Sequence, residues 1–346
     1  MRLFSYRNRT RLRRFLAGLL SLLLALALIS WGVLVYLDRY IVYDHDGAHL
    51  DFHWQDLGST APDVTAPSVD AQISYVSADD DAALTGTRKV TGYYVTTDML
   101  KNLDAVESVL STGSYYAVLL DLRDSYGNFY YPSSVSGAQT AASVDTQAVR
   151  SLIDTLARKG VYLIARIPAF ADQRHCLNNT DLGLPLSSGA LWADSSGCYW
   201  MDPANPQVID YLESICTELQ SMGFQEVVLK DYQFPDTDAI VYNESEVTKD
   251  QVLSNTAATL QSDLSSLPLK VSLGIKADQP FASMLTEGRL YFELDDGAQI
   301  DSIVTTQAAT VATPDVQIVF LTESHDTRFD TYGHLAPAVE SSTPAE

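Results

Sequence analysis

Acidic, basic and aromatic residues that could act on a sugar follow a series of short apolar runs in this chain. The run at residues 227–229 leads directly into Lys230, Asp231 and Tyr232. Paired carboxylates can serve as proton donor and as nucleophile or base, and aromatic faces stack on sugar rings. The other candidates are Asp121, Arg166 and Glu323 at similar exits, with Trp192, Trp200 and Asp202 in one loop. This composition is typical of a sugar site, although Asp121 and Arg166 could equally form a structural ion pair.

The apolar runs alternate with amphipathic segments, most of which end in glycine. Expected strands cover residues 90–97, 116–122, 161–170, 226–232 and 269–277, and expected helices cover 98–113, 146–160, 206–223 and 250–267. Apolar strands separated by such helices predict parallel βα units that are buried on both faces. Without a dinucleotide-binding glycine motif, the pattern favours a (β/α) TIM-type barrel over a doubly wound sheet. The candidates would then meet at the carboxyl ends of the strands.

The final third of the pattern is less regular. Its pieces are a short helix at 281–288 and further segments at 289–294, 300–307 and 316–322. The connections between them are too short for full crossover helices. We therefore expect a barrel that is degenerate here, which either closes with abbreviated units or does not close fully.

The N-terminal segment predicts a membrane anchor. Six arginines within residues 1–14 precede an uncharged apolar run of 23 residues, 15–37, which as a helix would reach about 34 Å. The arginines should stay cytoplasmic, which places the rest outside the cell. A signal peptide cleaved near Ala27 is the alternative, but the apolar run continues ten residues further. We expect a single-pass protein of the cell membrane with an extracellular linker at 38–87, a barrel at 88–334 and a disordered tail at 335–346.

Charge and composition exclude several classes of partner. The net charge is −22, and all acidic residues lie after residue 37. Such a surface repels nucleic acid and argues against polyanionic partners generally. No second Cys/His pair stands at zinc-ligand spacing, and no calcium-loop spacing follows Asp295 and Asp296. We expect neither a metal nor a cofactor.

The three cysteines separate into a pair and a single residue. Cys176 and Cys198 flank a polar stretch rich in glycine, serine and asparagine. In an exported protein this pattern predicts a disulfide that pins a long loop. Cys216 lies at helical spacing and is expected to be buried and free.

Several segments resemble a known family. They are VTGYYVTT, YAVLLDLRDSYGNFYY, RKGVYLIARIPAFAD and the stretch from LWADSSGCYWMDP to GFQEVVLKDYQFP. Between residues 90 and 235 their order and spacing resemble a family of bacterial TIM barrels classed as "putative glycoside hydrolases". The resemblance implies an exported barrel that is similar to α-amylase-like enzymes and acts on a glycan.

The resemblance breaks at the most important position. The family pattern G-F-D-E-I-x-F-D-Y-x-R-F-P places an aspartate where a nucleophile is expected. Aligned without a gap, this chain has Lys230 there, and Asp231 falls on the tyrosine. A slip of one residue restores the aspartate but requires a bulge, because successive side chains on a strand point to opposite faces.

Two main readings remain open. In the first, the chain hydrolyses a cell-envelope or extracellular polysaccharide, with Asp231 as nucleophile or stabiliser, Glu323 as proton donor and Asp121 as a third acid. The residues expected to contact the glycan are Arg166, Trp192, Trp200, Tyr232 and Asp202. In the second, Lys230 neutralises the site and the barrel binds glycan without turnover. A barrel that only supports an envelope complex would instead turn its aromatic residues into the core.

Overall fold

The computed structural model describes residues 41–44, 47–50, 88–242, 246–277, 281, 285, 287–295, 297–324 and 326–339. The chain divides into two compact units, residues 1–75 and 76–346. In the first unit, β1 (Ile41–Asp44) and β2 (Gly47–Leu50) form an antiparallel hairpin within the segment expected to be a linker. The expected membrane segment, 15–37, lies outside the described residues. Among the residues that are described, no helix is both long and apolar enough to cross a membrane.

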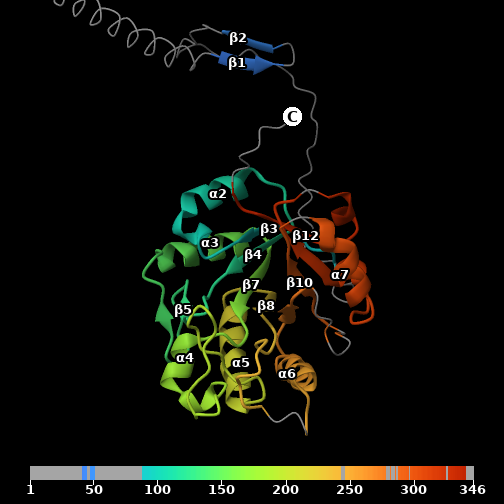
Figure 1. Cartoon of the computed structure of the whole chain (residues 1–346). Helices are drawn as coiled ribbons and strands as arrows, with labels where there is room; N and C mark the ends of the chain where they lie inside the picture. Colours follow the sequence, from blue (N-terminus) through green and yellow to red (C-terminus); the bar gives the residue numbers. More distant parts are fainter. Residues whose placement is uncertain are drawn as a thin grey trace, which may run out of the picture. The chain divides into compact units, whose positions relative to one another are not determined.

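The second unit is a closed barrel of parallel strands, as the sequence predicted (Figure 1). Its strands are β3 (Thr91–Val95), β4 (Ala117–Asp121), β7 (Tyr162–Pro168), β8 (Glu226–Lys230), β9 (Lys270–Gly274), β10 (Leu290–Glu293), β11 (Ile318–Leu321) and β12 (Gly333–Pro337). Each strand pairs with its neighbours in chain order, and β12 pairs with β3 to close the ring. A short parallel pair, β5 (Asn128–Phe129) and β6 (Gln139–Thr140), lies in the loop after β4.

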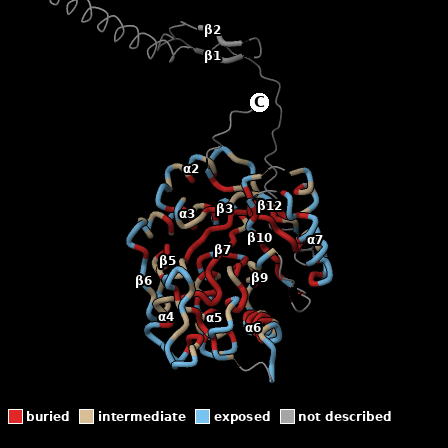
Figure 2. Tube along the Cα trace, viewed as in Figure 1, coloured by how far each residue is buried: buried red, intermediate tan, exposed pale blue. Residues whose placement is uncertain are grey.

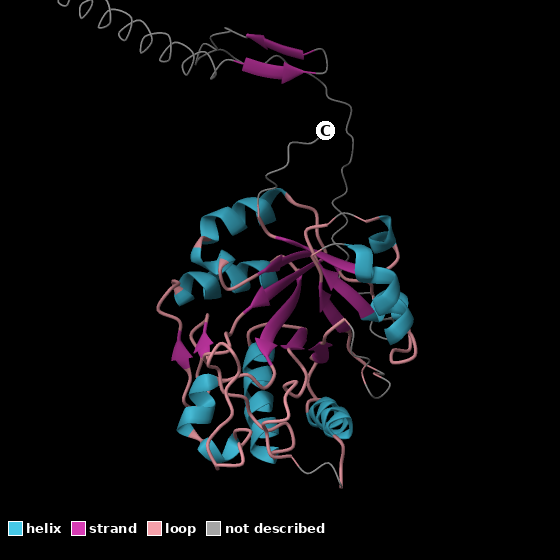
Figure 3. Cartoon of the chain, in the orientation of Figure 1, coloured by secondary structure: helices cyan, strands magenta, loops and turns pink. Residues whose placement is uncertain are grey.

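Helices surround the strands (Figure 3). They are α2 (Leu103–Thr112), α3 (Thr146–Arg158), α4 (Gln173–Asn178), α5 (Pro206–Ser221), α6 (Lys249–Asp263), α7 (Ile300–Gln307) and α8 (Pro314–Gln317). Local sequence sets where several of them begin. The side chain of Asp145 accepts hydrogen bonds from the first turn of α3, and Thr248 with Gln251 forms a capping box on α6.

The last third closes with abbreviated units, which was one of the two expected outcomes. Only a 3-10 turn, Thr327–Asp330, connects β11 to β12. The strand β12 itself was missed, and the predicted end of the barrel at residue 334 is wrong, because Ala338 N still donates to the carbonyl of Tyr94. The helix expected at 281–288 is also wrong at Leu285, which forms a bridge to Val311.

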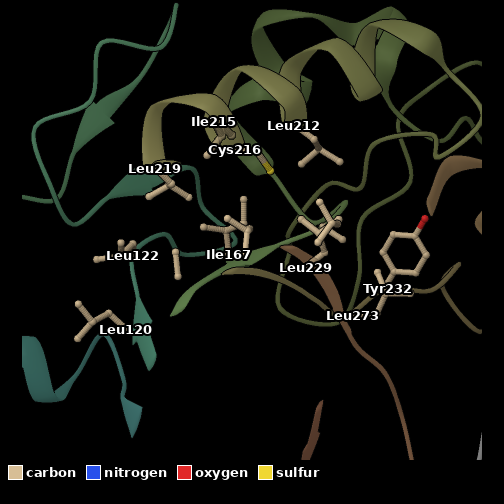
Figure 4. Packing of buried hydrophobic residues seen from close by; sticks show 14 of the residues in the cluster. Leu120, Leu122, Ile167, Leu212, Ile215, Cys216, Leu219, Leu229, Tyr232 and Leu273 are labelled. Carbon is tan, nitrogen blue, oxygen red and sulfur yellow. The ribbon is translucent and has the colours of Figure 1, made fainter. Parts of the chain in front are cut away.

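The main apolar core lies between the strands and the helices. Leu212, Ile215 and Leu219 on one face of α5 pack towards Ile167 and Leu229 on the strands and towards Leu122, which follows β4 (Figure 4). Figure 2 shows that buried residues concentrate along the strands, with exposed residues on the outer helix faces. Burying each such leucine stabilises the fold by roughly 1.5–3 kcal/mol. This packing holds the strands in fixed positions and therefore fixes the side chains at their ends.

A second, smaller apolar cluster fills the inside of the barrel. Its members come from alternate positions of the strands: Val90, Ala117, Leu119, Ile164, Val228, Tyr291, Val319, Leu321 and Leu335. Because side chains alternate along a strand, the same alternation directs Asp121, Arg166 and Lys230 inward at the carboxyl ends. We call that end of the barrel the mouth and the opposite end the floor.

An ion pair and its hydrogen bonds fill the floor. Glu226, at the start of β8, pairs with Arg289, and both side chains are almost fully buried. The Glu226 carboxylate also accepts hydrogen bonds from the hydroxyls of Tyr162 (2.9 Å), Tyr291 (2.9 Å) and Ser272 (2.5 Å). A buried charge is tolerated only when it is paired and hydrogen-bonded in this way.

Candidate active site

Arg166 is the centre of a charged cluster at the mouth. Asp121 and Arg166 are register partners on β4 and β7. The guanidinium donates to both oxygens of Asp121, at 2.5 and 2.8 Å, and to Oε1 of Glu293 on β10 at 2.5 Å. Burial alone would lower the pKa of Arg166, but the two carboxylates raise it above its usual range. The cluster is therefore a fixed array of one cation between two anions.

Glu293 is the carboxylate at the mouth that the sequence analysis missed. Its Oε2 lies 3.5 Å from Nζ of Lys230, and its side chain remains about half exposed, at 52%. Burial acts to raise its pKa, but Arg166 and Lys230 more than offset this and lower the pKa. Glu293 is the last residue of β10 (Leu290–Glu293). It lies two positions after the inward-facing Tyr291 and therefore also faces inward. That alternation was a signal in the sequence that could have identified it.

Lys230 and Asp231 meet the mouth in different ways. Lys230 takes the inward position in step with Glu226 and Val228. The next residue, Asp231, has a φ of 55°, the only positive φ at a non-glycine residue in the described part of the chain. A left-handed backbone at this point breaks the strand alternation, which would otherwise turn Asp231 towards the helices. The expected bulge is thus replaced by a single left-handed residue.

The charges that act on Asp231 locate its carboxyl group at the mouth. They belong to Lys230, Glu293, Arg166 and Lys276, which lie at the ends of strands β7 to β10. Burial is the largest influence and raises the pKa of Asp231, while the three cations oppose that rise. Asp231 and Glu293 therefore form a pair of neighbouring carboxyl groups whose pKa values are displaced in opposite directions.

Tyr94 and Glu323 complete the mouth on the side of β3 and β11. Tyr94 packs against the inner apolar cluster, and burial raises the pKa of its hydroxyl, with further increases from Glu323 and Glu293. Glu323 follows β11 at an inward position, two residues beyond Leu321, and is exposed. Glu323 therefore lies at the edge of the cluster, whereas Glu293 lies within it.

Four predicted binding residues make contacts within the fold. The Tyr232 ring is buried and its hydroxyl donates to the carbonyl of Leu253 at 2.8 Å. Trp200 is buried, its indole N–H donates to Oδ2 of Asp194 at 3.0 Å, and Trp192 packs edge-on against it, with ring centroids 6.3 Å apart. Asp202 accepts from the backbone N–H of Ala204. Hydrogen bonding and packing thus commit the predicted platform of Trp192 and Trp200 to the loop after β7.

The predicted disulfide is not formed. Cys176, Cys198 and Cys216 are all buried free thiols. The Sγ of Cys198 instead lies 3.0 Å from the carbonyl oxygen of Ser125, to which it can donate. The prediction was correct only for Cys216, and hydrogen bonds rather than a covalent bond hold this loop.

A second buried ion pair supports the loops around the mouth. Arg123, which follows β4, pairs with Asp172, which precedes α4, and neither side chain reaches solvent. The hydroxyl of Tyr211 donates to the same carboxylate at 3.1 Å, and His175 stacks on the Tyr211 ring. These contacts join the loops after β4 and β7 to helix α5. In the part of the chain that is described, no group of three or more His, Cys, Asp or Glu residues could hold a metal ion.

Three solved structures are among those that this chain resembles. A hypothetical protein from Ruminiclostridium thermocellum ATCC 27405 is 19% identical, with a TM-score of 0.46, and the match covers 52% of this chain and 96% of that one. An alpha-L-fucosidase isoenzyme 2 from Paenibacillus thiaminolyticus is 13% identical (TM-score 0.46; 71% and 42%). An alpha-galactosidase from Lactobacillus brevis is 12% identical (TM-score 0.46; 75% and 38%). This chain thus spans less than half of either glycosidase, and at these scores neither likeness bears on activity.

Sequence comparison gives a more direct assignment. None of the curated protein sequences matches the chain. Residues 92–278, however, match a family model described as "Putative glycosyl hydrolase domain". The matched range runs from β3 through β9 and includes Asp121, Arg166, Lys230 and Asp231. Because the match spans more than half of the chain, the chain belongs to this glycosyl hydrolase domain family.

Proposed function

We propose that the barrel is a glycoside hydrolase whose catalytic pair is Asp231 and Glu293. The observation that carries this proposal is the opposite displacement of their pKa values at one end of the barrel. Two neighbouring titratable groups whose environments separate their pKa values are the usual basis for assigning an acid and a base. Glu293 replaces Glu323 as the partner of Asp231, because Glu293 is held by Arg166 and Lys230.

Each carboxyl group has a definite task in this reaction. Asp231, whose pKa is raised by burial, donates its proton to the glycosidic oxygen as the bond to the anomeric carbon breaks. Glu293, kept ionised by Arg166 and Lys230, attacks the anomeric carbon or takes a proton from the water that does so. Carboxyl groups about 5 Å apart would give retention of configuration, and a separation above about 6.5 Å would give inversion. In either case one water molecule is consumed for each bond that is cleaved.

The test combines a glycan panel with two substitutions. The full chain is assayed for turnover and binding on cell-envelope and extracellular polysaccharides. Asp231→Asn and Glu293→Gln should each lower kcat by about 10²–10⁴-fold while binding is retained, because each removes a proton-transfer group. Asp154→Asn, on a half-exposed residue of α3, is the matched control and should leave turnover unchanged. Unaltered turnover in both site variants would rule out this catalytic pair.

One observation favours a second candidate, a barrel that binds glycan without cleaving it. Lys230 stands where the family pattern has an aspartate, and both Lys230 and Arg166 contact the Glu293 carboxylate. Two cations on one carboxylate weaken it as a nucleophile or base. Saturable binding of a glycan with no turnover in the unsubstituted chain would establish this function instead.

We also propose that the chain is anchored in the cell membrane with the barrel outside. The support comes from the sequence alone: six arginines, then 23 uncharged apolar residues. Protease added to intact cells should remove the barrel, whereas a cytoplasmic control protein should stay intact. Recovery of the barrel as a freely secreted species cut near Ala27 would favour the signal-peptide alternative.

A further inference from the structure

Lys276 lies at the exit of β9, between the two proposed catalytic residues. Backbone hydrogen bonds join Tyr232 N to the carbonyl of Gly274 (3.0 Å) and Ile275 N to the carbonyl of Tyr291 (3.2 Å). The exit of β9 is thus held between the segment that follows β8 and strand β10. Strand alternation from Ser272, which faces Glu226 inside the barrel, gives Lys276 an inward position at the mouth. Its ammonium group therefore belongs to the rim of the candidate site.

Among the described residues, the ion pairs at the rim do not include Lys276. Continued register from the Tyr291–Gly274 pair puts Glu293 level with Lys276. That carboxylate, however, is already engaged by Arg166 and Lys230. Lys276 is exposed, and no residue in the described part of the chain forms a hydrogen bond or an ion pair with it. It does act on the Asp231 carboxyl electrostatically, which is consistent with its position at the rim.

We propose that the sugar unit bound at this mouth carries a negative charge, most simply the carboxylate of a uronic acid, and that Lys276 binds it. This inference rests on the glycoside hydrolase function proposed above. An exposed ammonium group beside these ion pairs can form a charge-assisted hydrogen bond with an anionic substituent. The chain as a whole is acidic, with a net charge of −22, and repels long polyanions. Lys276 therefore selects a single charged unit rather than a uniformly charged chain.

The test uses matched neutral and acidic small substrates with the full chain. The probes are 4-nitrophenyl glycosides of glucose and glucuronic acid, and of galactose and galacturonic acid, in both anomers, with glucose 6-phosphate and 6-sulfate glycosides as further arms. We expect kcat/KM, or the dissociation constant where turnover is absent, to favour the charged member. Comparison of the uronic acid, 6-phosphate and 6-sulfate glycosides then shows which charged group is preferred. Lys276→Met should reduce the preference by about tenfold, the usual worth of a hydrogen bond between charged groups.

Two further variants complete the test. Lys276→Arg should retain the preference, and Lys159→Met, at an exposed lysine after α3, should not change it. Equal or better use of every neutral member would overturn the inference while leaving the hydrolase function in place. A preference that is unchanged in Lys276→Met would also overturn it. If no member is bound or cleaved, the proposed function fails, and this inference fails with it.

Discussion

The chemistry of the mouth depends on a single unusual backbone residue. The sequence places Lys230 where the family has an aspartate and moves the aspartate one position along the chain. On a regular strand, Asp231 would face the helices. A φ of 55° instead leaves its carboxyl within the influence of Arg166, Lys230 and Glu293. The left-handed backbone thus allows both residues to reach the same site.

The pH dependence of activity tests how Lys230 acts on the pair. In the proposed mechanism the active form has Glu293 ionised and Asp231 protonated, so the rate would fall as pH drops through the pKa of Glu293 or rises through that of Asp231. Lys230 lowers both pKa values. Lys230→Met should therefore move both limbs of the kcat/KM profile to higher pH, with Lys159→Met as control. A shift to lower pH would contradict this assignment.

The backbone conformation of Asp231 also has a measurable cost. A left-handed conformation costs an ordinary residue about 1 kcal/mol, and glycine adopts it freely. Asp231→Gly should therefore unfold with a free energy about 1 kcal/mol higher than Asp231→Ala, measured by urea denaturation. Two variants of equal stability would show that Asp231 is not left-handed in solution.

The thiols give a separate test of the loop after β7. Burial raises the pKa of Cys176 to about 12 and that of Cys198 to about 11, so both should react slowly in the native protein. After unfolding without a reductant, thiol titration should count three free cysteines. A count of one would restore the disulfide that the sequence predicted.

Much of the barrel follows from the sequence at the scale of single elements, and its exceptions have physical causes. Strands β3, β4, β7, β8 and β9 coincide with predicted runs, and in β4, β7, β8 and β9 the reason is that apolar segments are buried on both faces. The strand β12 (GHLAP) has weak intrinsic propensity and forms because β11 and β3 both pair with it. Similarly, Trp200 has the composition of a sugar platform, but Asp194 occupies its N–H. Neither the pairing of β12 nor the hydrogen bond of Trp200 is visible in the hydrophobic pattern of the sequence.

The floor of the barrel offers a test at the scale of packed elements. Arg289→Met would leave the Glu226 carboxylate buried and without its cation, at a cost of about 3–5 kcal/mol. Adding Glu226→Gln should recover part of that loss, because the unpaired charge is then removed. Arg328→Met, at a partly exposed arginine, should cost much less. Urea denaturation of the unsubstituted chain and these three variants measures the differences, and a double variant no more stable than Arg289→Met would contradict the ion-pair explanation.

At the scale of the whole molecule, closure depends on the final strand. A chain that ends at residue 339 keeps β12 and should fold. A chain that ends at residue 332 leaves the edges of β11 and β3 unpaired, and exposed strand edges associate with other chains. Size-exclusion chromatography and circular dichroism should find the first truncation monodisperse and the second aggregated. A well-folded shorter chain would show that β12 is not needed for closure.

The filled floor also determines how molecules would pass through such an enzyme. Tyr162, Glu226, Arg289 and Tyr291 occupy the interior at that end, so the barrel is not a tunnel. Substrate and product would therefore both pass through the mouth, and a product that dissociates slowly would block binding of the next substrate. Inhibition by the released sugar should accordingly be competitive, and a glycan chain cannot be threaded through the barrel during successive cleavages.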